Sequence, residues 1–178
     1  GQAVLFYIFE RPLDKHLTTL KKHLLEAERQ DVPVLIQLDP VTFWDGVPEL
    51  WNWFDKGISG YDESNRENVE WTSWSSADAV KLGWLNWGSQ IRLKPMANLF
   101  SEKYQNAVRE RMTTLLGTLS NWYKSLPENK KYLFGGVKIT GELCMGLNNW
   151  YYTGGNELYD KPKENDPTTG INMWNKPS

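Results

Sequence analysis

The hydrophobic positions of the chain follow strand and helix periods in separate stretches. Two short apolar runs, Val4–Phe9 and Val34–Leu38, flank the segment Asp14–Gln30, in which leucines recur at helical spacing. A continuous apolar run is typical of a strand buried on both faces, and a leucine stripe is typical of an amphipathic helix. The pattern therefore predicts a strand–helix–strand unit with parallel strands and a right-handed crossover.

The same alternation returns later in the chain. An apolar stripe predicts the longest helix over Ser101–Leu126, and the run Phe134–Thr140 predicts a third parallel strand. Between these parts, the capping-box pattern at Ser75 predicts a helix that ends at Gly88. The stripe of the long helix consists of Tyr104, Val108, Met112, Leu115, Leu119, Trp122 and Leu126.

Tryptophan is unusually frequent. The chain has ten tryptophans in 178 residues, and seven of them fall between Trp44 and Trp87. Two interpretations are open: the rings form flat apolar platforms on which sugars stack, or they pack as a buried cluster under a long loop. The stretch from Val41 to Thr72 is too long and too aromatic for a simple connector, and such loops are usually functional or tightly packed.

Acidic residues follow the ends of two predicted strands. Asp39 closes the second strand, and Glu142 follows the third. Because ligands of α/β proteins bind at the carboxyl ends of strands, this placement predicts a site. Asp39 can equally cap the turn that begins at Pro40.

The residues around Glu142 favour carbohydrate chemistry. Glycoside hydrolysis uses two carboxylic acids, one of which has a raised pKa and donates a proton. Leu143, Met145 and Trp150 would desolvate Glu142 and raise its pKa, which makes Glu142 the candidate catalytic acid. The candidate substrate-binding residues are Asp39, Trp44, Trp51, Trp53, Trp71, Asn148, Asn149 and Trp150.

Composition narrows the other classes of function. The net charge is −2 and no basic stripe is visible, so we expect no nucleic-acid partner. No apolar run is long enough to cross a membrane, so we expect no membrane span. The sequence also has no Cys/His cluster and no glycine-rich phosphate loop, so we expect no metal and no cofactor. The single cysteine, Cys144, cannot form a disulfide within the chain, and we expect His16 and His23 to be surface residues.

Several motifs resemble an uncharacterised group of glycosidase-like (β/α)₈-barrel proteins. The resemblance runs from about Val34 to Gly170. It rests on Phe43-Trp44, Pro48-Glu-Leu-Trp-Asn-Trp53, Asn68-Val-Glu-Trp71, the segment Gly83–Arg92, Gly136-Val-Lys138, Gly146-Leu-Asn-Asn-Trp-Tyr-Tyr152 and Asp166-Pro-Thr-Thr-Gly170. By similarity to retaining barrel glycosidases, Glu142 takes the acid/base position at the end of the fourth barrel strand. This chain has Gly141 where those enzymes have asparagine, and Gly141-Glu142-Leu143 also resembles the acid motif of β-amylases.

The resemblance implies an α/β fold that forms about the first half of a (β/α)₈ TIM barrel with a long Trp-rich loop. Residues 1–160 would form this partial barrel and residues 161–178 a polar irregular tail. Because a full barrel takes about 250 residues, we expect a fragment of a secreted glycoside hydrolase. Its partners would be carbohydrate and another polypeptide that completes the barrel, or further copies in an oligomer. The alternative is a non-catalytic carbohydrate-binding or structural protein with a Trp-rich interaction loop. The sugar, the linkage and the stereochemical course stay open.

Overall fold

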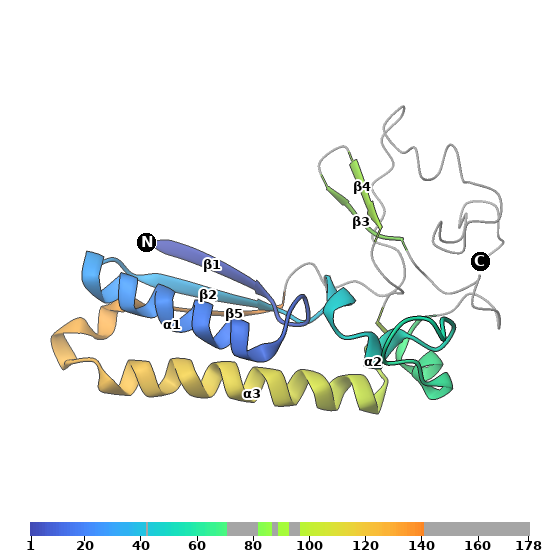
Figure 1. Ribbon diagram of the computed structural model, residues 1–178. Coiled ribbons are helices and arrows are strands. Elements are labelled where there is room, and N and C mark those ends of the chain that lie inside the picture. The colour runs from blue at the N-terminus through green and yellow to red at the C-terminus, as the bar shows by residue number, and fades with distance from the viewer. Residues whose placement is uncertain (42, 71–81, 87–88, 93–96, 141–178) are drawn as a thin grey trace. The chain divides into compact units, whose positions relative to one another are not determined.

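The computed structural model describes residues 1–41, 43–70, 82–86, 89–92 and 97–140 (Figure 1). The chain divides into two compact units. The described part of the first unit is 1–41, 43–46 and 105–140, and that of the second unit is 47–70, 82–86, 89–92 and 97–104.

The first unit is built on a three-stranded parallel sheet. The strands are β1 (Gln2–Tyr7), β2 (Val34–Asp39) and β5 (Phe134–Ile139), in the order β1-β2-β5. Both neighbouring pairs are parallel, which confirms the predicted strand–helix–strand unit and the third strand. Glycine at 136 allows the irregular register between β2 and β5, because its φ of 130° strains any other residue.

Two long helices lie on one face of this sheet (Figure 1). These are α1 (Leu13–Gln30) and α3 (Glu102–Ser125), close to their predicted bounds. Apolar side chains of the central strand β2 are buried together with the apolar stripes of the helices, as their periodicity predicts. The stripes and the strand contribute Leu20, Leu24, Ala27, Val34, Ile36, Leu38, Met112, Leu115, Leu119 and Trp122.

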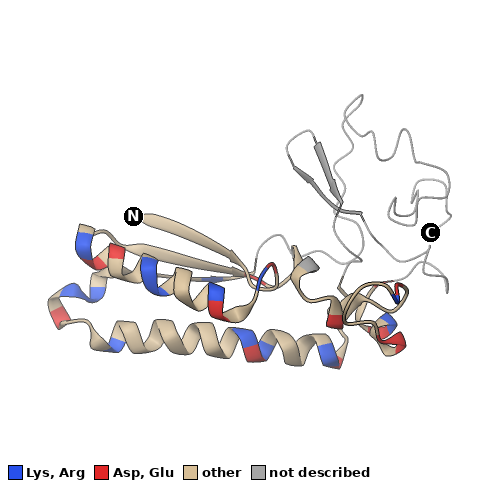
Figure 2. Cartoon of the chain, viewed as in Figure 1, with Lys and Arg blue, Asp and Glu red and all other residues tan. Residues whose placement is uncertain are grey.

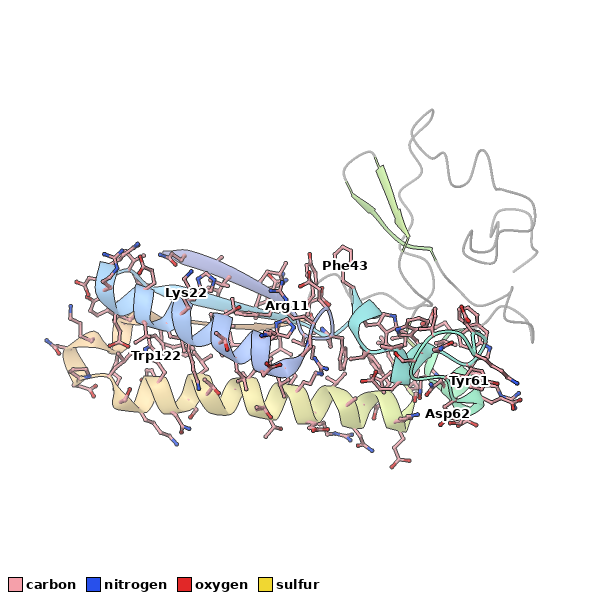
Figure 3. The ribbon with its side chains drawn as sticks, in the orientation of Figure 1. Arg11, Lys22, Phe43, Tyr61, Asp62 and Trp122 are labelled. Atoms are coloured by element: carbon pink, nitrogen blue, oxygen red, sulfur yellow. The ribbon has the colours of Figure 1, made fainter. Side chains whose placement is uncertain are left out.

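Polar contacts fix the helices of this unit. The indole Nε1 of Trp122 donates to Glu28 Oε1 at 2.7 Å, which joins α3 to α1 (Figure 3). At the same, C-terminal end of α1, Asp31 takes a left-handed conformation and ends the helix, and its carboxylate accepts from Lys130 Nζ at 2.5 Å. The remaining charges are spread along both helices with the two signs interspersed (Figure 2).

The described part of the second unit has short elements and a polar core. It contains α2 (Pro48–Trp51), the 3₁₀ helix η2 (Glu63–Asn68) and a hairpin of β3 (Leu82–Asn86) and β4 (Ser89–Arg92). The side chains of Asn52, Asn65 and Asn68 are almost completely buried. Their amide nitrogens donate to carbonyl oxygens of α2 and of the loops around it, so these three side chains pair backbone acceptors in a segment with few regular backbone hydrogen bonds.

The prediction of a partial (β/α)₈ barrel is wrong. The described residues form a small open parallel sheet with helices and a separate antiparallel hairpin, and no barrel. A barrel needs each strand to be followed by a helix and then by a parallel neighbour. Between β2 and α3 this chain instead has 3₁₀ turns, the short helix α2 and the β3–β4 hairpin.

Two local predictions also fail. The helix expected up to Gly88 is a strand over residues 82–86, whereas its beginning lies outside the described residues. The strands β3 and β4 pair as a hairpin, because the two residues between them in sequence are a common length for a hairpin connection. A glycine such as Gly88 is as typical of a hairpin turn as of a helix end. His16, expected on the surface, is only 2% exposed, since its turn of α1 packs against Phe6 of β1.

Candidate functional site

The ends of all three parallel strands meet at one edge, called here the carboxyl edge and defined by Tyr7, Asp39 and Thr140. Tyr7 pairs with Asp39 in the β1–β2 register. The backbone N–H of Thr140 donates to the carbonyl oxygen of Leu38 at 2.8 Å, which extends the β5 ladder by one residue. Parallel pairing therefore brings three segments that are distant in sequence to the same place.

Asp39 lies at this edge, as predicted, but it is buried, with 3% of its surface exposed. Its Oδ1 accepts the backbone N–H of Val41 at 2.9 Å, and its carbonyl oxygen accepts the N–H of Ile8 at 2.9 Å. The first bond makes the Asx turn expected when Asp precedes Pro40. Asp39 thus orders the chain leaving β2 and links it to the turn that follows β1.

An aromatic pair stands at the carboxyl edge. The rings of Tyr7 and Phe43 meet edge to face, with centroids 4.7 Å apart and planes at 77°. Both residues are half-buried, and Phe43 can be followed in Figure 3. Sequence reasoning missed this pair, because Tyr7 lies inside the predicted strand and Phe43 beside the more prominent Trp44. The useful signal would have been an aromatic residue at the last position of a strand.

Backbone strain is concentrated at the same edge. Phe43 has φ of 55° and Thr140 has φ of 93°, in the left-handed region that side chains other than glycine avoid. The third such residue among those described is Asp31, where a left-handed residue ends α1. Each of the first two conformations costs on the order of 1–3 kcal/mol and persists because its surroundings enforce it. Such strain is common where a chain shapes a ligand site.

The described tryptophans among the predicted binding residues are buried. Trp44 is 1% exposed, Trp51 2% and Trp53 7%, and Trp53 packs edge to face on Phe54. Trp44 belongs to the first unit, whereas Trp51 and Trp53 belong to the second. Their burial favours the packing interpretation for these three rings, because a buried face cannot stack on a sugar.

The turn that contains Trp44 is packed tightly against the turn after β1. A Cβ atom at Gly46 would lie 2.5 Å from the carbonyl oxygen of Glu10 and 2.6 Å from that of Phe9. Only glycine fits there, so the chain after β2 is fixed against the chain after β1.

The other predicted site residues lie outside the described residues. They are Trp71, Glu142, Asn148, Asn149 and Trp150.

Positive charge surrounds His16 near the carboxyl edge. Burial lowers the pKa of His16, and the charges of Arg11 and Arg111 lower it further, against an opposing effect of Glu10. Arg111 reaches from α3 and its Nη1 donates to the carbonyl oxygens of Ile8 at 2.6 Å and Arg11 at 2.9 Å. Its guanidinium also lies 5.0 Å from the ring centroid of Phe9. The turn after β1 is therefore held from two sides, by Arg111 and by the residues around Gly46.

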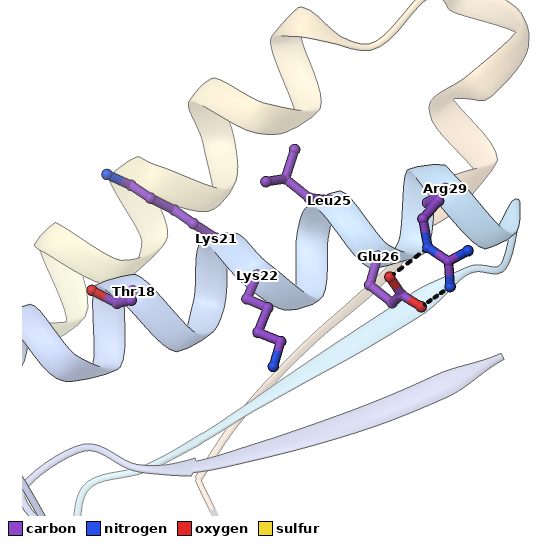
Figure 4. Close-up of a pocket in the computed structure, with 6 residues that line it drawn as sticks. All are labelled: Thr18, Lys21, Lys22, Leu25, Glu26 and Arg29. Atoms are coloured by element: carbon purple, nitrogen blue, oxygen red, sulfur yellow. Dashed lines mark hydrogen bonds and ion pairs between the residues drawn. The ribbon is translucent and has the colours of Figure 1, made fainter.

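A groove on the outer surface of α1 is separate from these residues (Figure 4). Thr18, Lys21, Lys22, Leu25, Glu26 and Arg29 line it. Arg29 binds Glu26 through two nitrogens, at 2.8 Å and 2.5 Å. None of the predicted site residues lies in this groove, and its long side chains are typical of a solvated helix surface.

Neither a metal centre nor a membrane-spanning helix is found in the described part of the chain. Within those ranges, no three His, Cys, Asp or Glu side chains are grouped so that they could hold a metal ion. None of the described helices has the length and apolar character needed to cross a membrane. Comparisons with protein-family models, with curated proteins and with solved structures find no match to this chain.

Proposed function

We propose that this chain binds carbohydrate at the carboxyl edge of its parallel sheet and that Glu142 acts there as the acid of a glycoside hydrolase. The observation that carries the proposal is the half-buried pair of Tyr7 and Phe43 beside the strand end at Asp39. Aromatic rings offer apolar faces to the C–H groups of a sugar, and strand ends are where open α/β sheets bind ligands.

Chain connectivity supports a place for Glu142 near this pair. Glu142 follows Thr140 by two residues, and two residues of extended chain span at most about 7 Å. A carboxyl group close to aromatic rings and shielded from water would have a raised pKa, as a general acid requires. Asn148 and Asn149 would supply hydrogen bonds to sugar hydroxyls.

Non-catalytic carbohydrate binding is the second candidate, and the burial and hydrogen bonding of Asp39 favour it. Hydrolysis needs a second carboxyl group. Among the described residues, Asp39 supplies a carboxylate at the carboxyl edge. This carboxylate is buried, and its Oδ1 accepts a hydrogen bond from the backbone N–H of Val41. A chain with the aromatic pair and without a second accessible carboxylate would bind a glycan and leave it intact.

One set of variants separates the two candidates. The full chain is screened against immobilised glycans and against a panel of glycosides with poor leaving groups. In the first candidate, Glu142→Gln abolishes turnover and retains binding, whereas near-normal turnover contradicts the acid role. In both candidates Tyr7→Ala and Phe43→Ala weaken glycan binding about tenfold or more, and Phe100→Ala, which removes an exposed ring of the second unit, leaves it unchanged. Absence of binding to every glycan contradicts both.

A further inference from the structure

A buried histidine packs behind the strand that carries Tyr7. His16, in the first turn of α1, is 2% exposed, and its ring meets that of Phe6 on β1 edge to face, with centroids 5.8 Å apart. The imidazole hydrogen-bonds the backbone of Tyr7, and its Nε2 has no hydrogen-bond partner within the described part of the chain. One ring nitrogen therefore holds the end of β1, while the other is buried among groups that do not bond it.

These surroundings suit a neutral imidazole. A neutral ring carries one N–H, whereas a protonated ring carries two and needs a second acceptor. Arg11 in the turn after β1 and Arg111 on α3 oppose a further positive charge at His16, and Glu10 favours it. Asp39, the carboxylate of β2, is engaged in its own Asx turn. A proton on His16 therefore adds a buried N–H and a buried charge, both of which are costly without a partner.

Tyr7 links this histidine to the aromatic pair. It is the last residue of β1, its backbone is bound by His16, and its ring centroid lies 4.7 Å from that of Phe43. The carbonyl oxygen of the next residue, Ile8, accepts from Arg111 at 2.6 Å. The same two side chains that meet around His16 and Arg111 thus hold the backbone on which the aromatic pair depends.

We propose that His16 is a pH-sensitive switch of the carboxyl edge: in mildly acidic solution its imidazole takes up a proton, leaves its buried position and releases Tyr7, which separates the aromatic pair and weakens ligand binding. Histidine is the side chain whose charge changes in this pH range. The identity of the ligand rests on the proposed function, whereas the switch itself rests on contacts between described residues.

Nuclear magnetic resonance of the full chain tests the switch without any ligand. The nuclear Overhauser effect between the rings of Tyr7 and Phe43 should be present at about pH 7 and lost towards pH 5. His16→Asn keeps an N–H donor near the position of Nδ1 and does not titrate, so it should keep the effect at both values. A persistent ring contact in the unaltered chain after the His16 resonances have titrated overturns the inference.

The other histidine of the chain supplies the matched control. The ring of His23 also meets Phe6 edge to face, with centroids 6.5 Å apart, and lies on the same helix. His23→Asn should leave the pH dependence of the Tyr7–Phe43 contact as it is in the unaltered chain. If His23→Asn abolishes that dependence and His16→Asn does not, the assignment to His16 is overturned.

Two exposed neighbours give a test that does not alter the buried ring. Arg11 and Glu10 form an ion pair at 2.8 Å on the surface, and they act on His16 with opposite sign. Arg11→Gln should move the midpoint of the ring separation to higher pH, and Glu10→Gln should move it to lower pH. Equal midpoints in the three chains, or shifts in the reverse directions, overturn the inference.

Binding to immobilised glycans tests the consequence for function. Between pH 7 and pH 5 the Kd of the unaltered chain should rise about tenfold or more, because the binding-competent fraction falls, and that of His16→Asn should rise less than about twofold. A pH dependence that persists in His16→Asn belongs to another group and overturns the inference. If the unaltered chain binds no glycan at either pH, the proposed function fails, and the ring contact still decides on the switch.

Discussion

Arg111 on α3 donates from one nitrogen, Nη1, to the carbonyl oxygens of Ile8 and Arg11, at 2.6 Å and 2.9 Å. Ile8 is completely buried, so water has little access to replace this donor. The contact satisfies two backbone acceptors of the turn between β1 and α1. It also fixes the chain that follows Tyr7, one half of the aromatic pair at the carboxyl edge.

Arg111→Ala should lower the free energy of unfolding by about 2–3 kcal/mol, because it leaves a buried carbonyl oxygen without a charged donor. Urea denaturation followed by circular dichroism measures the loss. Arg109→Ala is the control: Arg109 lies on the same helix and is exposed, with side-chain partners Asn106 and Gln105. Its loss should cost less than about 0.5 kcal/mol. Equal effects of the two substitutions would show that the turn does not depend on Arg111.

His16 should make stability depend on pH. Its pKa is lowered in the folded state from 6.5, first by burial and then by Arg11 and Arg111. Between the two pKa values the unfolded chain binds more protons, so stability is fully present above about pH 6.5 and falls as the pH drops towards the folded pKa. In His16→Leu this contribution should vanish, and the urea midpoint should decline less between pH 7 and pH 5. A decline as steep as that of the unaltered chain would contradict the assignment.

The pH effect can also be observed directly at the side chain. The imidazole resonances of His16 should titrate at lower pH than in an unfolded peptide. Titration of His16 at or above the peptide value would show that its surroundings do not disfavour the charged form.

Asn68 should be essential for the second unit. Its Nδ2 donates to the carbonyl oxygen of Leu50 at 2.8 Å, and its Oδ1 accepts from the hydroxyl of Ser101. With 1% of Asn68 exposed, Asn68→Ala removes the buried donor to the Leu50 carbonyl oxygen and the buried acceptor of the Ser101 hydroxyl, and should cost about 2–4 kcal/mol. Asn68→Asp keeps the acceptor and cannot donate to Leu50, so it should also destabilise.

Limited proteolysis should show the loss of Asn68 as faster cleavage within residues 47–70. Asn106→Ala is the matched control, because Asn106 is exposed on α3 and its side chain meets Arg109. Cleavage at the same rate in Asn68→Ala and Asn106→Ala would mean that the buried network does not stabilise this segment.

The sheet of the first unit should associate with another polypeptide. In the described sheet β1 and β5 are the outer strands, and Leu5 is 44% exposed. Unpaired strand edges with apolar neighbours favour association. Light scattering of the chain should therefore give a mass above that of a monomer, and Leu5→Lys should lower it. Leu25→Lys, at an exposed position of α1, should not. A well-behaved monomer with a cooperative thermal transition would contradict this prediction.

The three parallel strands and both long helices could be predicted because each rests on a local pattern. The stripe of the long helix shows how well this works: Met112, Leu115, Leu119 and Trp122 are all buried. A 3.6-residue period fixes which side chains share a face whatever the rest of the chain does. Asp39 at the end of its strand follows from the same local information.

Tertiary contacts decided the rest, since they depend on which segments meet. The number of strands in the sheet is set by long-range pairing, and the chain between β2 and α3 adds a hairpin where a barrel would need a parallel strand. Whether Trp44 stacks on a ligand or packs in the interior depends on the turn that covers it, which a residue type does not reveal. Tyr7 contacts Phe43, and Gln37 contacts Thr140 across 103 residues of sequence, because parallel register aligns the ends of strands that are far apart along the chain. No spacing along the chain encodes these contacts.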